Sequence, residues 1–270
     1  MSTMIAASPL RVTTPRVIRS EWIKFWSLRS TAITLAAAAA VYIGIGLLAS
    51  SIAGDGGPGP GQGPGGDGAA LGSTDLSLAG STFAQLVLGT LGVLLMAGEY
   101  STGMIRSTLA AVPSRLPVLW SKAAVFTAVV FPLMLVASLV AFLGGQAIIG
   151  DGGASLSDPG VLRAVVGSSV YLTGAGLMGL FLGALLRSTP AAISTLFGAL
   201  FLLEGIVQLL VPEAWRDTVG PYLPSTAGGA ISAVTQQDGT LTPWAGLAVF
   251  AAYLAALAIG AAWRLKRQDA

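Results

Sequence analysis

The sequence predicts an all-α integral membrane protein with six transmembrane helices, an N-terminal interfacial helix and a short cytoplasmic helix between spans two and three. The composition is 54% hydrophobic and only 10% charged, and mean hydropathy is +0.78. A soluble domain carries about 25% charged residues. This chain therefore has too few charged residues to form the water-facing surface of a soluble protein. The spacing of the apolar runs and the placement of the cations complete the prediction.

Six apolar segments have the length of about 20 residues that a helix needs to cross the hydrocarbon. They lie at about 31–53, 76–97, 118–145, 161–186, 190–211 and 243–263. The third is long enough to tilt or to break near Pro132. The segment before the first span is polar and basic up to Arg29, without a short apolar region and cleavage site, so we expect a retained span. Residues 1–270 then form one transmembrane domain.

The cations orient these spans. Twelve of the 14 Lys and Arg residues fall on one predicted side of the membrane. They are Arg11, Arg16, Arg19, Lys24, Arg29, Arg106, Arg115, Lys122, Arg187, Arg264, Lys266 and Arg267, whereas Arg163 and Arg216 fall on the other side. The side rich in Lys and Arg is cytoplasmic by the positive-inside rule. We therefore expect a multi-pass protein of the plasma membrane with both termini in the cytoplasm.

The two larger outside loops differ in composition. The first, 54–72, is rich in Gly and Pro and has no positive charge, as is typical of a flexible linker. The second, 212–242, contains EAWRDTV. That piece could form a short interfacial helix with Trp215 at the level of the headgroups.

The N-terminal segment PRVIRSEWIKFWSLRS is amphipathic at helical period. One arc holds Ile18, Trp22, Phe25 and Trp26, and the opposite arc holds Ser20, Lys24 and Ser27. Aromatic residues on one face and cations such as Arg19 and Lys24 around the other predict a helix in the inner-leaflet interface. The alternative is a basic flank that only sets topology.

A compact polar stretch, 98–125, lies between spans two and three. Helix propensity resumes through 101–111 after Gly98 and Glu99, and Pro113 ends it. A plain loop would need only a few turn residues. We expect a short helix across the cytoplasmic mouth, with its charges accessible to a soluble partner.

In this stretch the chain resembles the ABC-2 type permeases, the membrane subunits of type V ABC exporters. The matching residues are Glu99, Gly103, Arg106, Leu109, Pro113, Arg115 and Lys122. SEWIKFWSLRST at 20–31 and YLPSTAGGAI at 222–231 are similar to other segments of the family, in the same order. Met104 departs from the pattern, where a small polar residue, usually Thr, is expected.

The resemblance implies that the short helix is a coupling helix that inserts into a groove of a cytoplasmic ATPase. Glu99 would orient it by bonding to the N-terminal helix, with Arg19 or Lys24 as partner; the alternative is a simple charge at a helix end. Two permease subunits, identical or different, would pair above two ATPases. This chain has no GxxxxGK[ST] motif, so we expect no enzyme activity and no cofactor in it, with ATP and Mg bound by the partner.

Polar residues inside the spans are candidates for a pathway or a dimer interface. Glu204 is the only acid deep within a predicted span, and Gln208 lies one turn later. The alternative is a protonated or paired Glu204 with a structural role. Ser81, Gln85 and Thr90 are the polar set of span two, and spans two and five line the pathway in the family.

Small residues recur along span four at Ala175, Gly179 and Gly183. This spacing permits close helix contact. The contact could form within one subunit or between two subunits.

Composition also limits the competing functions. The chain has no Cys and no His, which excludes disulfides, thiolate or imidazole metal sites and Ser-His catalysis. The cations flank spans, so nucleic acid is not an expected partner, whereas membrane lipids are. An ion-coupled secondary transporter and a non-transporting scaffold or immunity protein remain as alternatives. The few charges in the spans favour a hydrophobic or amphipathic substrate.

Overall fold

The computed structural model describes residues 13–54, 72–235 and 239–267, and every regular element among them is helical. The predicted Gly/Pro-rich loop and Arg11 lie outside the described residues. The helices are α1 (Thr14–Ser27), α2 (Arg29–Gly54), α3 (Ser73–Ser77), α4 (Ser81–Ser101), α5 (Met104–Ala111), α6 (Leu116–Ile149), η1 (Gly150–Gly152), α7 (Val161–Leu186), α8 (Thr189–Phe197), η2 (Gly198–Leu202), α9 (Leu203–Leu210), α10 (Glu213–Val219), η3 (Gly220–Tyr222), α11 (Pro224–Gly229), η4 (Ala230–Ser232) and α12 (Pro243–Arg267).

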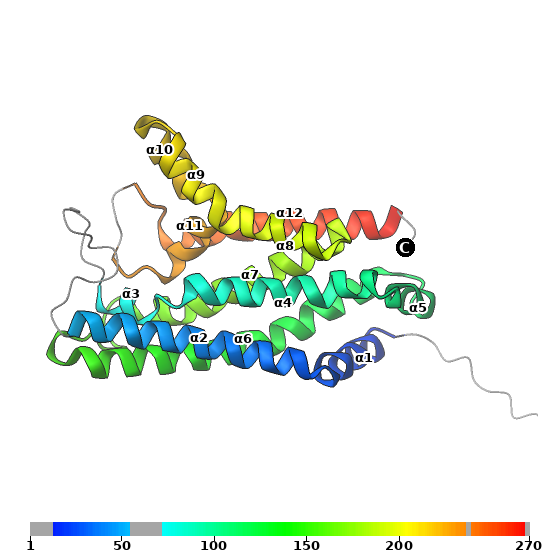
Figure 1. The fold of residues 1–270 in the computed structure, drawn as a ribbon, viewed down its shortest axis with the longest axis horizontal. Coiled ribbons are helices and arrows are strands. Elements are labelled where there is room, and N and C mark those ends of the chain that lie inside the picture. Colours follow the sequence, from blue (N-terminus) through cyan, green and yellow to red (C-terminus); the bar gives the residue numbers. More distant parts are fainter. Residues whose placement is uncertain (1–12, 55–71, 236–238, 268–270) are drawn as a thin grey trace, which may run out of the picture.

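Among the residues that the structure describes, six stretches of helix are long and apolar enough to cross a membrane, which confirms the predicted fold class. They are Arg29–Ala53, Ser73–Ser101, Leu116–Gly152, Val161–Leu186, Thr189–Val207 and Pro243–Arg267. Helices α1 and α5 and the last turns of α12 gather at one end of the bundle (Figure 1), which we call the basic end. Helices α3 and α11 lie at the opposite end (Figure 1).

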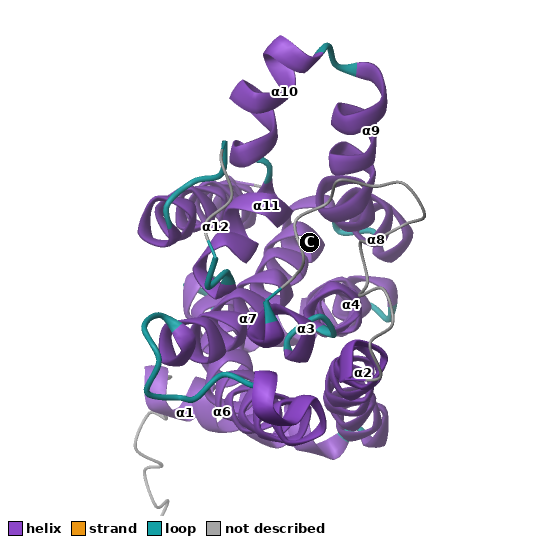
Figure 2. Ribbon diagram, turned by 90° about the vertical axis from the view of Figure 1, so that its left-hand side faces the viewer, coloured by secondary structure: helices purple, strands orange, loops and turns teal. Residues whose placement is uncertain are grey.

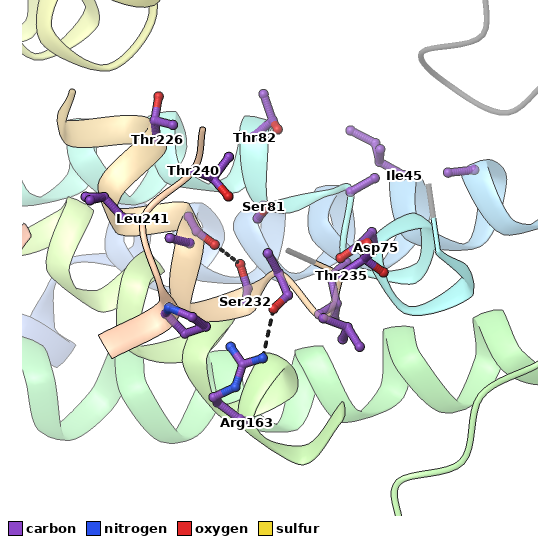
Figure 3. A pocket seen from close by; sticks show the side chains of 18 of the residues that line it. Ile45, Asp75, Ser81, Thr82, Arg163, Thr226, Ser232, Thr235, Thr240 and Leu241 are labelled. Atoms are coloured by element: carbon purple, nitrogen blue, oxygen red, sulfur yellow. Dashed lines mark hydrogen bonds between the residues drawn. The ribbon is translucent and has the colours of Figure 1, made fainter. Parts of the chain in front are cut away.

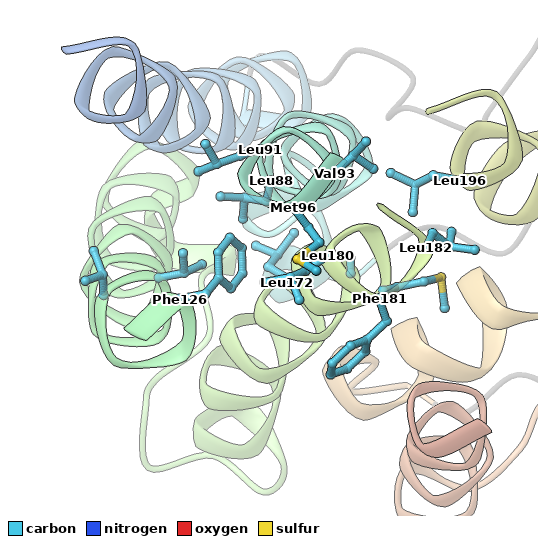
Figure 4. Close-up of a cluster of buried hydrophobic side chains, with 14 of the residues drawn as sticks. Leu88, Leu91, Val93, Met96, Phe126, Leu172, Leu180, Phe181, Leu182 and Leu196 are labelled. Carbon is cyan, nitrogen blue, oxygen red and sulfur yellow. The ribbon is translucent and has the colours of Figure 1, made fainter. Parts of the chain in front are cut away.

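Helix α7 is the centre of the bundle. It packs against α4, α6, α8 and α12, and these neighbours surround it in the view of Figure 2. Of its most apolar stretch, 78% is buried. The hydrophobic core follows from this arrangement: large side chains of α4, α6 and α7, among them Leu88, Phe126 and Leu172, interdigitate at its centre (Figure 4).

The contact between α4 and α7 depends on glycine. A Cβ on Gly179 would collide with the backbone of Gly89, and a Cβ on Gly92 would collide with the carbonyl of Gly176. Close approach of two backbones gives more van der Waals contact where no hydrophobic effect drives helices together. The small-residue stripe of span four thus serves a contact within the chain.

Some boundaries differ from the sequence prediction. Span two begins with α3 and a turn, and α4 continues past Ala97 to Ser101, so Glu99 lies inside the helix. Helix α6 runs unbroken through Pro132. The short helix begins at Met104 and not at Ser101, because Gly103 adopts a left-handed conformation with φ 73° that interrupts the chain of helical residues.

The fifth span is not one uniform helix. Helix α8 passes into the π-helical segment η2, and α9 then leads away from the bundle towards α10 (Figure 1). A π-helical segment inside a helix widens its turn and is frequent at functional sites. The predicted EAWRDTV helix is confirmed as α10, in which Trp215 is exposed.

Candidate functional site

Four charged side chains form a closed ion network at the basic end. The ammonium group of Lys122 donates to Glu21 Oε2 and to Glu99 Oε1, both at 2.7 Å. The ammonium group of Lys24 donates to Glu21 Oε1 at 3.1 Å and to Glu99 Oε1 at 3.2 Å. Two carboxylates and two ammonium groups therefore balance one another.

The network joins four helices. Glu21 and Lys24 come from α1, Glu99 from the last full turn of α4 and Lys122 from the second turn of α6. Lys24 also donates to Thr108 Oγ1 of α5 at 3.2 Å. One connected set of hydrogen bonds therefore links α5 to α1, α4 and α6.

Burial makes this network sensitive to loss of a member. Glu21, Glu99 and Lys122 are each less than 10% exposed. Removing one partner of a buried ion pair leaves an uncompensated charge, which costs about 3–5 kcal/mol. Partial burial lowers the pKa of Lys24, but the charges of Glu21 and Glu99 and their hydrogen bonds outweigh it and raise the pKa above its ordinary value of 10.5.

One atom of the network is left without a hydrogen bond. Glu99 Oε1 accepts from both lysines, whereas Glu99 Oε2 is buried and has no donor among the described residues. A buried acceptor without a donor costs about 1–3 kcal/mol. Glu99 Oε2 is therefore an acceptor that makes no hydrogen bond within the network.

The structure corrects the prediction that the charges of the 98–125 stretch are all accessible. Glu99 and Lys122 are buried and face each other, because the two charges satisfy one another inside the bundle. Arg106 on α5 and Pro113 in the following turn are exposed. Arg115 is half-buried, and its Nη1 donates to the carbonyl of Leu265 in α12 at 3.4 Å.

Helix α1 is also oriented differently from the prediction. Its polar residues Glu21 and Lys24 turn towards the bundle, where the ion network holds them. Trp22 and Trp26 are 43% and 50% exposed, whereas Phe25, expected on the same arc, is buried. Of the two cations named as partners for Glu99, Lys24 makes the contact; Arg19 is exposed and forms no ion pair with any described residue.

The polar residues of spans two and five do not meet in one site. Gln85 is buried and accepts a hydrogen bond from the hydroxyl of Tyr171 on α7, so it faces the interior of the chain. Thr90 is half-buried. Glu204 accepts a hydrogen bond from Ser225 Oγ at 3.2 Å and lines a small cavity of about 240 Å³ that Arg216 also lines. The side chain of Gln208 lies outside the described part of the structure.

Ser81 lies at the opposite end of the bundle, in a cavity of about 780 Å³. Thr82, Thr226 and Thr240 are among the hydroxyl-bearing residues that line this cavity (Figure 3). Arg163 also lines this cavity, and its guanidinium group donates to the carbonyls of Ile231 and Ala233, each at 2.9 Å. Because both guanidinium bonds go to backbone carbonyls, Arg163 holds the segment after α11 against α7.

Sequence reasoning missed Glu21 and Thr108. Glu21 is the only acid among the first 30 residues and lies three positions before Lys24, so its isolation in a basic segment was an available signal. Thr108 gave no such signal, because a hydroxyl on a short helix is ordinary. The pairing of Gln85 with Tyr171 and that of Glu204 with Ser225 are tertiary contacts, and no sequence pattern indicated either.

Comparison with known proteins adds no assignment. No protein-family model matches the chain, and no curated protein is significantly similar to it. The fold itself defines a class: an all-α, multi-pass membrane protein with six helices able to span the bilayer.

Proposed function

We propose that this chain is the membrane permease subunit of an ATP-binding cassette exporter, with α5 as the helix that docks onto a separate ATPase. The observation that carries the proposal is the attachment of α5. It lies at the basic end of the bundle (Figure 1), and Thr108 ties it to the ion network that joins α1, α4 and α6. Force applied to α5 would thus reach helices that span the membrane.

The surface of α5 supports a docking role. Ile105 and Leu109 are buried and fix one face of the helix to the bundle, whereas Met104, Arg106 and Ala110 are exposed. A helix with one face anchored and one face free can enter a groove on a soluble partner as a rigid element. In this assignment ATP and Mg bind the partner, and this chain moves a hydrophobic or amphipathic substrate across the plasma membrane.

Arg106→Glu tests the docking. We expect this charge reversal to abolish recovery of an ATPase with a Walker A motif when the tagged chain is purified from its native membrane in mild detergent. Lys266→Glu is the matched control, because Lys266 is an exposed cation at the same end of the molecule. Arg115→Glu is a poor probe, since it would also break the contact with Leu265.

The result separates the alternatives. An ATPase that copurifies with both variants contradicts the role of Arg106. A chain recovered without any ATPase, in a detergent that preserves another exporter complex, contradicts the exporter assignment and favours the secondary transporter or the scaffold.

The proposal includes a second permease subunit, and α9 is the element we expect at that contact. Leu209 and Leu210 are 84% and 76% exposed on a helix that leaves the bundle (Figure 1). The chain has no Cys, so Leu209→Cys introduces a single thiol. If the second subunit is another copy of this chain, oxidation should give a disulfide-linked dimer, whereas Leu143→Cys on α6, 54% exposed, should not. The same yield for both variants would contradict a specific contact through α9.

A further inference from the structure

A small cavity with two charged residues in its lining lies where the fifth span leaves the bundle. Helices α9 and α10 stand out next to each other there, with α11 at their base (Figure 2). The cavity has a volume of about 240 Å³, and we call it the α9–α11 cavity. Its lining residues are Glu204, Val207, Arg216, Gly220, Leu223 and Thr226. These residues carry one negative and one positive charge.

Each of the two charged groups keeps an accessible atom that makes no hydrogen bond with the described residues. Glu204 Oε2 accepts from Ser225 Oγ at 3.2 Å, whereas Glu204 Oε1 has no donor. Arg216 Nη2 donates to the carbonyl of Val211 at 3.3 Å, whereas Arg216 Nη1 has no acceptor. In these two side chains only Arg216 Nε is both buried and without a partner. A ligand can therefore reach one carboxylate oxygen and one guanidinium nitrogen.

The two charges do not neutralise each other directly. Glu204 and Arg216 line the same cavity, but no nitrogen of Arg216 lies within 4.0 Å of a Glu204 carboxylate oxygen. An ionisable group near the end of a membrane span is costly without a partner. A ligand that carries a positive and a negative group a few bonds apart would bridge the two side chains by charge-assisted hydrogen bonds. The cavity therefore selects for a zwitterion.

The depth of the cavity indicates a lipid headgroup. Glu204 lies in the last turn of the fifth span, which ends at Val207. Trp215 on α10 is 65% exposed, and tryptophan is enriched at the level where the hydrocarbon meets the headgroups. A water molecule occupies about 30 Å³ of liquid, so the cavity has room for a headgroup but not for the acyl chains. The chains would remain in the bilayer.

The lining residues discriminate between lipid headgroups. A primary ammonium group has three hydrogens to donate, so phosphoethanolamine can bond to Glu204 Oε1 and still offer its phosphate to Arg216. A choline group cannot donate and is recognised by aromatic side chains, whereas the described lining contains none. Phosphatidylglycerol has no ammonium group and would leave Glu204 without a counter-charge. Phosphoethanolamine therefore fits best.

The cavity and the expected subunit contact use different faces of α9. At about 100° per residue, Val207 lies about 60° from Glu204 around the helix. Leu209 and Leu210 lie about 140° and 120° from Glu204. A headgroup beside Glu204 thus leaves the exposed leucines available to a second subunit.

We propose that the α9–α11 cavity binds the phosphoethanolamine headgroup of a membrane lipid. Its ammonium group donates to Glu204 Oε1, and a phosphate oxygen accepts from Arg216 Nη1. The bound headgroup connects α9 to α10 and supplies each side chain with an opposite charge. This assignment goes beyond the proposed function and does not depend on an ATPase.

The test uses the purified chain in phosphatidylcholine nanodiscs that contain a low, equal fraction of one photoactivatable lipid. The reactive group is placed at the start of an acyl chain, next to the headgroup. We expect the phosphatidylethanolamine probe to label residues 203–226 roughly tenfold more than matched phosphatidylcholine and phosphatidylglycerol probes, the effect of one hydrogen bond to a charged group.

A soluble competitor distinguishes two sources of the headgroup. Glycerophosphoethanolamine carries the same ammonium and phosphate groups without acyl chains. Competition with the lipid probe would show that the free headgroup also binds, whereas labelling that persists would show that binding requires the lipid in its bilayer.

A matched pair of variants tests the recognition. Glu204→Gln removes the carboxylate and should reduce labelling by the phosphatidylethanolamine probe to that of the phosphatidylcholine probe. Asp151→Asn removes an exposed acid in η1 and should leave the preference unchanged. Arg216→Gln removes the phosphate contact and should lower labelling by all three probes. Melting of each variant checks that it is folded.

Three results would overturn the proposal. The first is equal labelling of residues 203–226 by the three probes, which would show that no ammonium group is recognised. The second is a preference for phosphatidylethanolamine that survives Glu204→Gln in a folded protein. The third is no labelling of residues 203–226 by any of the probes, which would leave the cavity to water.

Discussion

At the scale of single residues, the main feature of the basic end is the set of hydrogen bonds that two lysine ammonium groups donate to two carboxylates. Glu99 Oε1 accepts from two lysines, and Glu21 uses both of its oxygens, so no lysine hydrogen bond in the network is redundant. Buried charges are tolerated only when paired and hydrogen-bonded. The network is therefore specific in geometry, and its members should not be interchangeable.

Lys122→Met tests this dependence. It removes the most buried cation and leaves Glu21 Oε2 without a donor, so we expect a loss of about 3–5 kcal/mol and a clearly lower melting temperature. Tryptophan fluorescence during heating in detergent measures it. Adding Glu99→Gln to Lys122→Met should recover part of the loss, because without Lys122 the two carboxylates share Lys24 as their remaining cation in the network, and Glu99→Gln removes one of the two negative charges. An unchanged melting temperature in Lys122→Met would contradict the network.

Lys24 gives the network a dependence on pH. Its folded pKa lies above the ordinary 10.5, so its contribution to stability is present below that value and is lost as the pH rises through the folded pKa. We expect wild type to melt above Lys24→Met in neutral buffers and the difference to shrink in alkaline buffers beyond 10.5. The effect is small because Lys24 is 35% exposed. A difference that stays constant across this range would contradict the assignment.

At the scale of elements, the bundle is organised by how closely α4 approaches α7. Backbone contact at Gly89 and Gly179 leaves no room for a side chain. Such contact fixes how α4 and α7 are positioned relative to each other along their axes. It thereby also fixes the position of Glu99 near the end of α4. Element packing and the ion network are thus connected through one helix.

Gly179→Ala should destabilise the protein strongly, because the new Cβ would collide with backbone and not with a flexible side chain. Gly44→Ala is the control. Gly44 also lies within a helix but nothing approaches its Cβ position within 4 Å, and alanine is the better helix former by about 0.5–1 kcal/mol. We expect Gly179→Ala to melt lower or fail to fold and Gly44→Ala to melt as wild type or higher; equal behaviour would contradict the close contact.

At the scale of the whole molecule, topology places α1, α5 and the end of α12 together at one end, although they are far apart in the sequence (Figure 1). Their residues include seven of the 14 Lys and Arg residues. The positive-inside rule predicts that this end faces the cytoplasm, as the proposed docking of an ATPase on α5 would require.

Single cysteines test this orientation cleanly, because the chain has none of its own. Ser107→Cys lies on α5 and Ser157→Cys lies before α7, and both positions are exposed. A maleimide that cannot cross membranes should label Ser157→Cys on intact cells and label Ser107→Cys only after the cells are opened. The opposite pattern would reverse the topology and contradict the exporter assignment.

The sequence alone determined the class of protein, the six spans and the existence of the short helices α1, α5 and α10. Length and apolar composition decide these features locally, since a bilayer requires about 20 apolar residues per helix. The interruption of span five at η2 and the continuous α6 were not predictable, because neighbouring helices and the balance of backbone hydrogen bonds decide such details.

Only the tertiary structure decided which charges are buried. Lys122 was predicted on an accessible surface but lies in the network with Glu21, a residue 101 positions away. No periodicity in the sequence encodes such a pairing, because it depends on where four helices meet. The positions of the membrane spans are thus decided by the local sequence, whereas the candidate site is formed only when the helices pack together.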